Sequence, residues 1–183
     1  MSCYDIDTLR KGVLAGEKYQ FHFFWRPTAE GGYLSQWWMG RFTADGVEYS
    51  CAEQYMMAEK ARLFGDEEML EAILGTDDPR AMRAYGRKVQ GFDAKVWGES
   101  CYGIVLRGNL AKFGQDEALR AYLLGTGERI LVEASPWDRV WGIGMGASNA
   151  AAEDPLKWRG KNLLGFVLTE VRDRLRLEEQ GAL

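Results

Sequence analysis

The segment from Val132 to Gly146 carries the densest set of chemically capable side chains in this sequence. It combines a carboxylate, a guanidinium, two indoles and three closely spaced glycines, namely Asp138, Arg139, Trp137, Trp141, Gly142, Gly144 and Gly146. A carboxylate can transfer a proton or stabilise developing positive charge, and a guanidinium can bind phosphate through paired hydrogen bonds. Glycine lets the backbone approach a ligand closely, because it has no Cβ. The segment therefore predicts a functional loop.

A plainer interpretation of the same segment also fits its composition. Tryptophan usually packs against other side chains, and neighbouring opposite charges can form a surface ion pair of little energetic weight. On that view the loop holds a buried tryptophan anchor beside a surface salt bridge. The local composition leaves both interpretations open.

Glu53 is a second candidate carboxylate. On a helix it shares one stripe with Met57, Lys60 and Phe64, and Lys60 follows it by about 10 Å of axial rise. Such a wall would present an acid to one end of a ligand and a cation to the other. The alternative is structural, because Ser50-Cys51-Ala52-Glu53 has the spacing of a capping box and Lys60 would then be a solvated surface charge. The pattern favours the capping role.

Trp97, Asn162 and His22 each have a structural and a functional interpretation. Trp97 begins an apolar stripe with Cys101, Ile104 and Val105, so core packing is its default role and stacking on a base is the alternative. Asn162 is a candidate N-cap of a C-terminal helix, whose N-terminus could also receive an anion. His22 is the only histidine, and in its aromatic strand we expect a structural role.

Periodicity and capping patterns predict the elements that must position these residues. The aromatic run 20–25 predicts a strand, and Asp45-Gly46 within 41–49 predicts a two-residue hairpin turn. Helices are expected at 50–64, 66–74, 78–89, 93–111 and 116–124, followed by a strand from Ile130 and a long C-terminal helix. Strands and helices do not alternate, and the glycines at 142–146 match a dinucleotide fingerprint only weakly, which argues against a Rossmann-type sheet. The predicted fold class is α+β, a helix-rich single domain with a small β-sheet.

Composition narrows the class of protein. The 183 residues suit one domain, and 46% apolar with 27% charged residues are typical of a folded soluble chain. The net charge of −4 argues against non-specific nucleic-acid binding, so an anionic ligand would need a local cluster of Arg and Lys. Three widely spaced cysteines, Cys3, Cys51 and Cys101, fit neither a zinc site nor a disulfide framework. With no signal peptide or membrane span recognised, we expect a cytoplasmic protein.

Five segments, taken in chain order, resemble the NADAR (YbiA-like) family over about residues 20–176. They are Phe23-Phe24-Trp25 with Leu34-Ser35-Gln36-Trp37; the run from Cys51 to Ala61; Trp97 fifteen residues before Lys112-Phe113; Val132 to Pro136 with Asp138 to Gly144; and Gly160 to Gly165. One position departs from the family's usual Phe-Ser-Asn: this chain has Leu34-Ser35-Gln36, which changes the edge of the expected pocket. The resemblance implies a YbiA-like fold for the single domain 1–183.

The resemblance also implies N-glycosidase activity without a metal or another cofactor. Substrate classes known in the family are phosphoribosyl-aminopyrimidine intermediates of riboflavin synthesis and ADP-ribose derivatives, including ADP-ribosylated guanine in nucleic acid. Glu53 and Asp138 carry over as catalytic carboxylates, and the candidate substrate-binding residues are Ser35, Lys60, Trp97, Arg139, Trp141, Gly142 and Asn162. The sequence leaves open which carboxylate is the acid and which the base. The alternatives are a module that binds ADP-ribose or a related nucleotide without cleaving it, and an interaction protein with no small-molecule pocket; the oligomeric state stays open.

Overall fold

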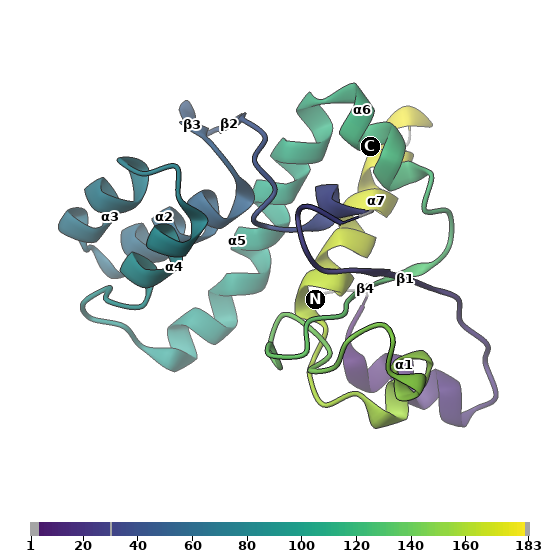
Figure 1. Cartoon of the computed structure of the whole chain (residues 1–183). Helices are drawn as coiled ribbons and strands as arrows, with labels where there is room; N and C mark the ends of the chain where they lie inside the picture. The colour runs from purple at the N-terminus through teal and green to yellow at the C-terminus, as the bar shows by residue number, and fades with distance from the viewer. Residues whose placement is uncertain (1–3, 30, 182–183) are drawn as a thin grey trace. The chain divides into compact units, whose positions relative to one another are not determined.

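Helices dominate over strands in the computed structural model, which describes residues 4–29 and 31–181 (Figure 1). The helices are α1 (Ile6–Leu14), α2 (Ala52–Phe64), α3 (Glu67–Leu74), α4 (Pro79–Gly86), α5 (Ala94–Gln115), α6 (Glu117–Leu124) and α7 (Leu163–Glu179). The strands are β1 (Phe21–Phe24), β2 (Phe42–Ala44), β3 (Val47–Tyr49) and β4 (Ile130–Glu133). Short 3₁₀ turns occur at Gly32–Leu34, Ala150–Glu153 and Pro155–Lys157. The predicted helix-rich α+β class is confirmed.

The chain divides into two compact units. Unit 1 combines the residues up to Ser35 with those from Glu117 onward, and unit 2 is the continuous stretch Gln36–Asp116. Each unit is described by itself below. The prediction of one domain over 1–183 stays a prediction.

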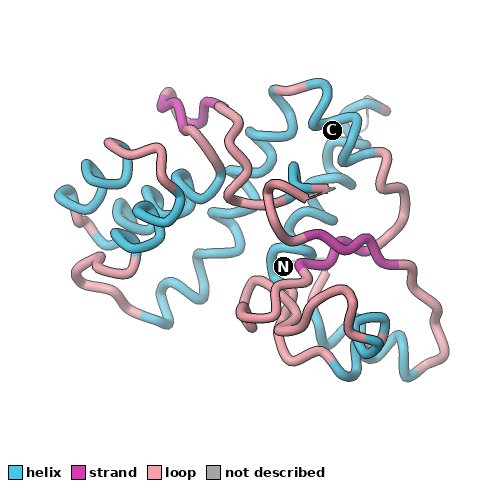
Figure 2. The backbone as a smooth tube through the Cα atoms, viewed as in Figure 1, coloured by secondary structure: helices cyan, strands magenta, loops and turns pink. Residues whose placement is uncertain are grey.

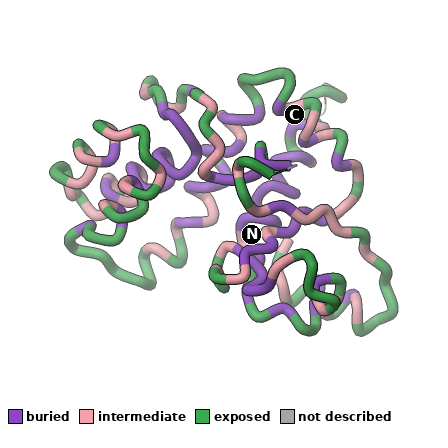
Figure 3. The backbone as a smooth tube through the Cα atoms, viewed as in Figure 1, coloured by how far each residue is buried: buried purple, intermediate pink, exposed green. Residues whose placement is uncertain are grey.

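Unit 1 is built on a parallel pair of strands. β1 pairs with β4 so that Phe21 lies opposite Ile130 and Phe24 opposite Glu133. The α7 helix packs against β4, and its residues from Leu164 to Arg172 are all buried (Figure 3). Residues 134–149, which follow β4, contain no helix or strand (Figure 2). Backbone carbonyls rather than a sheet must therefore hold this loop in place.

Unit 2 places α2 among three other helices. The α2 helix packs against α3, α4 and α5, and its residues from Ala52 to Ala58 are all buried. The β2–β3 hairpin turns at Asp45 and Gly46, whose φ angles of 51° and 78° are those of the tight turn that Asp-Gly favours. The predicted hairpin and its position are confirmed.

Several predicted boundaries need correction. The α4 helix ends at Gly86, before the predicted Val89, and α5 continues to Gln115, beyond the predicted Ala111. Asp78 and Asp93, at which two of the predicted helices begin, are N-caps and accept backbone N–H groups. The α1 helix was missed. It begins after Asp5, whose carboxylate accepts the N–H groups of Asp7 and Thr8.

The cysteines and the hydropathy of the helices bear on the predicted cellular location of the protein. Cys51 and Cys101 are buried free thiols, and Cys3 lies outside the described residues. Within residues 4–29 and 31–181, no helix has the length and apolar character that a membrane crossing requires. The cytoplasmic location stays a prediction.

Candidate active site

Glu53 is buried in the first turn of α2, with 5% of its surface exposed. The predicted capping box is wrong, because the N-cap residue of α2 is Cys51 rather than Ser50, and Cys51 makes no side-chain cap hydrogen bond. Gln54 Oε1 accepts the Ser50 backbone N–H at 2.7 Å, while Gln54 Nε2 donates to the Thr76 carbonyl at 2.9 Å. Glu53 is therefore a buried carboxylate in the first turn of α2. Burying an acid is costly, and buried acids are candidates for a functional role.

The segment before the β2–β3 hairpin contacts the start of α2. The carbonyl of Gln36 accepts the Glu53 N–H at 2.9 Å. Gln36 is 8% exposed, and its side-chain Oε1 is buried without a hydrogen-bond partner among the described residues. Ser35, a predicted site residue in unit 1, is buried at the end of the preceding 3₁₀ turn. The sequence singled out Gln36 only as a departure from the family pattern, whereas in the structure its backbone carbonyl bonds to Glu53 and its side-chain oxygen is a buried, unsatisfied acceptor.

Lys112 is a buried lysine in the same unit, only 1% exposed. Its Nζ lies 4.9 Å from the Phe113 ring centroid and 5.5 Å from that of Trp38. Burial lowers the pKa of Lys112 to about 7, so this side chain can gain or lose a proton at neutral pH. Sequence reasoning quoted Lys112 in a motif but gave it no role. The signal was present, because Lys112 continues the helical stripe of Cys101 and Ile104.

Cys51 links Lys112 to Glu53 electrostatically. Burial raises the pKa of the Cys51 thiol, the Glu53 carboxylate raises it further, and the Lys112 ammonium opposes the shift. Both charges therefore act on one buried position at the start of α2. We call Gln36, Cys51, Glu53 and Lys112 the buried polar cluster. Clusters with perturbed titration occur preferentially at functional sites.

Lys60 contacts three residues that lie close to or include Trp97. Its Nζ donates to the Gly86 carbonyl at 2.7 Å and lies 4.3 Å from the Phe92 ring centroid and 5.6 Å from the Trp97 ring centroid. Burial lowers the pKa of this ammonium. The solvated-charge interpretation of Lys60 is thus wrong. Trp97 is half-buried, so its predicted default of core packing is only partly met.

Asp138 organises the loop of unit 1. Its Oδ1 accepts the N–H groups of Val140 at 2.8 Å and Trp141 at 2.7 Å, and its own N–H donates to Ser135 Oγ at 3.2 Å. No described residue donates a hydrogen bond to Oδ2. The carboxylate is therefore held in one orientation with one oxygen available to a ligand. It forms no salt bridge with Arg139, so the plainer interpretation of the loop fails on that point.

The aromatic and glycine residues of the loop differ from each other in role. Trp137 is 85% exposed, not a buried anchor, and Trp141 is half-buried. Gly142 is buried, and a Cβ there would lie 2.8 Å from the Glu133 carbonyl oxygen. Close backbone approach at Gly142 thus serves packing on β4. Arg139 is exposed.

Asn162 occupies the predicted N-cap position, but its side chain does not cap α7. Its Oδ1 accepts the Glu133 N–H at 3.0 Å and its Nδ2 donates to the Leu131 carbonyl at 2.9 Å, which ties the start of α7 to β4. The first amides of α7 are also used, because Leu163 and Leu164 donate to loop carbonyls. The predicted anion site at this helix terminus is wrong for those amides.

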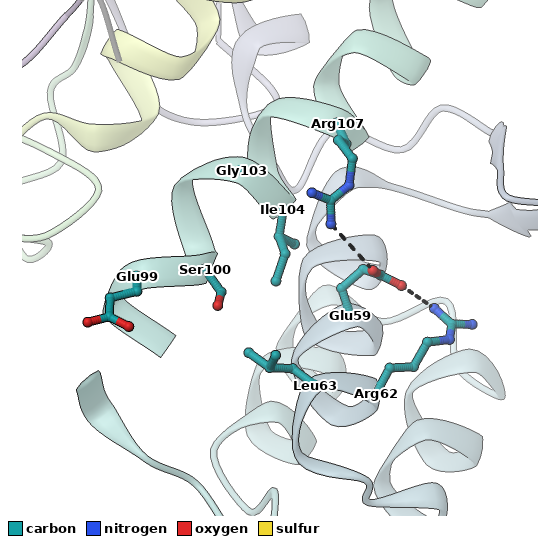
Figure 4. Close-up of a pocket in the computed structure, with 8 residues that line it drawn as sticks. All are labelled: Glu59, Arg62, Leu63, Glu99, Ser100, Gly103, Ile104 and Arg107. Carbon is teal, nitrogen blue, oxygen red and sulfur yellow. Dashed lines mark hydrogen bonds and ion pairs between the residues drawn. The ribbon is translucent and has the colours of Figure 1, made fainter. Parts of the chain in front are cut away.

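A cavity of about 520 Å³ lies between α2 and α5 (Figure 4). Glu59 sits between two arginines there, 2.6 Å from Arg62 and 3.9 Å from Arg107, while Leu63 and Ile104 supply apolar surface. None of the predicted site residues lines it. The carboxylate of Glu59 already balances the guanidinium groups, so this cavity is a weaker anion site than its arginines suggest.

The predicted site residues fall into both units. Unit 2 holds Glu53, Lys60 and Trp97, and unit 1 holds Ser35, Asp138, Arg139, Trp141, Gly142 and Asn162. Within unit 2 the structure brings Lys60 to Trp97, and within unit 1 it brings Asp138 to the Trp141 backbone. The pairing of Glu53 with Asp138 around one substrate stays a prediction.

Comparison with known proteins agrees with the resemblance. The model of the NADAR domain matches residues 23–176. The N-glycosidase R617 of Acanthamoeba polyphaga mimivirus is 41% identical over 145 residues, 76% of this chain and 85% of that protein. The NMR structure of YbiA from E. coli superimposes with a TM-score of 0.74 at 28% identity, covering 89% of each chain. The riboflavin biosynthesis protein VVA0006 of Vibrio vulnificus is 26% identical over 95% of this chain, which spans 42% of that longer protein.

Proposed function

This chain belongs to the NADAR family, and from that premise we infer that it is an N-glycosidase, a hydrolase of bonds between a ribose carbon and a nitrogen. The relatives R617 and YbiA bear that name. For this chain we propose two substrate classes: phosphoribosyl-aminopyrimidine intermediates of riboflavin synthesis, and ADP-ribose derivatives, including ADP-ribosylated guanine. The name of the Vibrio vulnificus relative supports the first class.

The proposed reaction uses the carboxyl groups of Glu53 and Asp138. As the bond breaks, its electron pair passes to the leaving nitrogen, which takes up a proton, and positive charge develops on the ribose. Water adds to the anomeric carbon and loses a proton. Asp138 stabilises the ribose charge or accepts the proton from water, and Glu53 protonates the leaving nitrogen or binds a ribose hydroxyl.

The observation that carries this proposal is the burial of Glu53, an acid with 5% of its surface exposed, in the first turn of α2. The orientation of Asp138 adds support, because backbone donors fix one oxygen and leave the other available. Pre-organised charge of this kind is a major source of catalysis. In the same proposal Trp97 stacks on the leaving base, and Lys60 orients Trp97 through its contacts with both the ring and the Gly86 carbonyl.

A hydrolysis panel tests the proposal. The purified protein is incubated separately with phosphoribosylamino-pyrimidine, ADP-ribose, NAD and ADP-ribosylated DNA, and released sugar and base are quantified. We expect turnover of at least one substrate, with a loss of 100-fold or more in Asp138→Asn. The amide Oδ1 of that variant can still accept both loop N–H groups, so the fold is retained. Asp77→Asn, which alters an exposed carboxylate, is the matched control.

Two outcomes would contradict the proposal. Undiminished turnover in Asp138→Asn would remove that carboxylate from the reaction. Tight binding of a nucleotide by calorimetry, with the ligand intact after hours, would instead identify the chain as a binding module.

A further inference from the structure

Two neighbouring segments of unit 1 carry three exposed cations. They are Arg139, in the loop after β4, and Arg159 and Lys161, which come just before α7. About twenty residues separate Arg139 from the other two in the sequence, so the grouping is a product of the fold. We call these three residues the loop cation cluster.

Backbone pairing holds the two segments together. The Lys161 N–H donates to the Arg139 carbonyl at 3.0 Å, and the Arg159 N–H donates to the Ile143 carbonyl at 3.0 Å. A Cβ at Gly160 would lie 2.8 Å from the Arg139 Cα, so glycine permits this close approach. Main-chain geometry therefore sets the backbone positions from which the three cationic side chains project.

Side-chain carbons of the two arginines both lie next to Gly144. The point where Gly144 would carry a Cβ lies 3.0 Å from Arg159 Cβ and 3.1 Å from Arg139 Cγ. Gly144 has a φ of 69°, which favours glycine, and a larger residue there would meet both side chains. Its lack of a side chain leaves the guanidinium stems next to one another.

The cluster carries positive charge that no described carboxylate neutralises through a salt bridge. Some exposed cations elsewhere in the described chain do have such partners: Arg41 has Glu48 at 2.5 Å and Lys157 has Asp154 at 3.1 Å. Asp138, next to Arg139, directs Oδ1 to the Val140 and Trp141 amides. Like charges repel, so neighbouring cations without a carboxylate partner suit an anion.

We propose that Arg139, Arg159 and Lys161 form a phosphate-binding subsite, which holds the phosphate of the ribosyl substrate near the Asp138 loop. Guanidinium groups bind phosphate oxygens in pairs, and a lysine adds a third charged donor. The inference rests on the proposed function for its substrate, although phosphate binding can be measured without any hydrolysis. A phosphomonoester on a small riboside and a phosphodiester of a single strand offer the same chemistry.

Trp137 separates these two sources of phosphate. It is 85% exposed and precedes Arg139 by two residues, so the Cα atoms of the two residues are at most about 7 Å apart. An exposed indole beside cations is the arrangement on which unpaired bases stack. A strand would therefore use Trp137, whereas a small phosphate ester would need only the cations.

The test measures binding of ribose 5-phosphate and of ribose by calorimetry, in the wild type and in the double variant Arg159→Gln/Lys161→Gln. We expect the wild type to bind ribose 5-phosphate at least 10-fold more tightly than ribose, and the double variant to lose most of that preference. Added NaCl should weaken the phosphate-dependent part. Arg80→Gln, which removes an exposed arginine of unit 2, is the matched control and should bind as the wild type does.

A second arm uses a short single-stranded oligonucleotide and the variant Trp137→Ala. Oligonucleotide binding that depends on both the cluster and Trp137 would assign the phosphate to a nucleic-acid strand. Binding of ribose 5-phosphate alone would assign it to a small substrate. Equal affinity for ribose 5-phosphate in the wild type and the double variant would overturn the subsite. If the subsite binds as expected while the hydrolysis panel shows no cleavage, the N-glycosidase proposal fails and the subsite stands.

Discussion

The side-chain oxygen of Gln54 accepts the backbone N–H of Ser50 at 2.7 Å, just before the start of α2. Gln54 Nε2 also donates to the Thr76 carbonyl, so this side chain ties the start of α2 to the segment after α3. The adjacent Glu53 is a buried carboxylate, and substitutions of the two residues should have different effects.

Glu53→Gln should therefore abolish turnover without unfolding the protein. We expect at least a 100-fold fall in kcat, because an amide cannot exchange the proton that the carboxyl group does. Gln54→Ala should do the reverse and lower the free energy of unfolding by about 1–3 kcal/mol, because buried donors lose their acceptor. Denaturant unfolding and steady-state kinetics on both variants check the pair. Comparable kcat in Glu53→Gln and the wild type would exclude Glu53 from the chemistry.

Asn162→Ala should be strongly destabilising although Asn162 was predicted as a binding residue. The substitution leaves the Glu133 N–H and the Leu131 carbonyl without their buried partner. Each unsatisfied group costs about 1–3 kcal/mol. Asn162 also has a φ of 55°, so Asn162→Gly separates backbone strain from the lost bonds. A melting temperature unchanged in Asn162→Ala would contradict the structural role.

Lys112 should make stability depend on pH. Its folded pKa of about 7 lies below the ordinary value of 10.5, so between these values the unfolded chain holds a proton that the folded chain lacks. Stability conferred by this group therefore rises with pH across that window, and the cost of charging it is fully present below pH 7. Lys112→Met removes this dependence, and the change in slope should be on the order of 1 kcal/mol per pH unit. Denaturant unfolding of both proteins from pH 6 to 10 checks it; parallel curves would refute the depressed pKa.

Gly142→Ala and Gly146→Ala should differ in effect despite their similar sequence context. A Cβ at Gly142 would press on the Glu133 carbonyl oxygen, whereas nothing lies within 4 Å of one at Gly146. We expect about 1–3 kcal/mol of destabilisation for the first and little change for the second. Thermal unfolding compares them directly. Equal stability of the two variants would show that β4 and the loop can separate without cost.

Local signals predicted the elements well. The Asp45-Gly46 turn and the helix starts at Asp78 and Asp93 depend on residues a few positions apart, and the structure has them where they were expected. The cap of α2 was misassigned by one residue, because Cys51 occupies the N-cap and is not a residue type that the capping pattern recognises.

Long-range relationships were beyond sequence reasoning. Nothing local joins β1 to β4, or Arg139 to Arg159 and Lys161, since these contacts arise from main-chain pairing between distant segments. The burial of Lys112 could have been predicted, because a lysine on an apolar helical stripe either breaks the apolar face or is itself buried in it. Asp138 was identified from residue type, but its fixed orientation depends on loop amides that only the fold reveals.

The parallel pairing of Phe21 with Ile130 imposes an order on biosynthesis. As the nascent chain leaves the ribosome, Gln36–Asp116 is complete while the aromatic strand Phe21–Phe24 still lacks its neighbour. Roughly a hundred further residues must be synthesised before the partner strand is available to form hydrogen bonds with it. Until then the edge of the aromatic strand is unpaired, and unpaired strand edges favour aggregation.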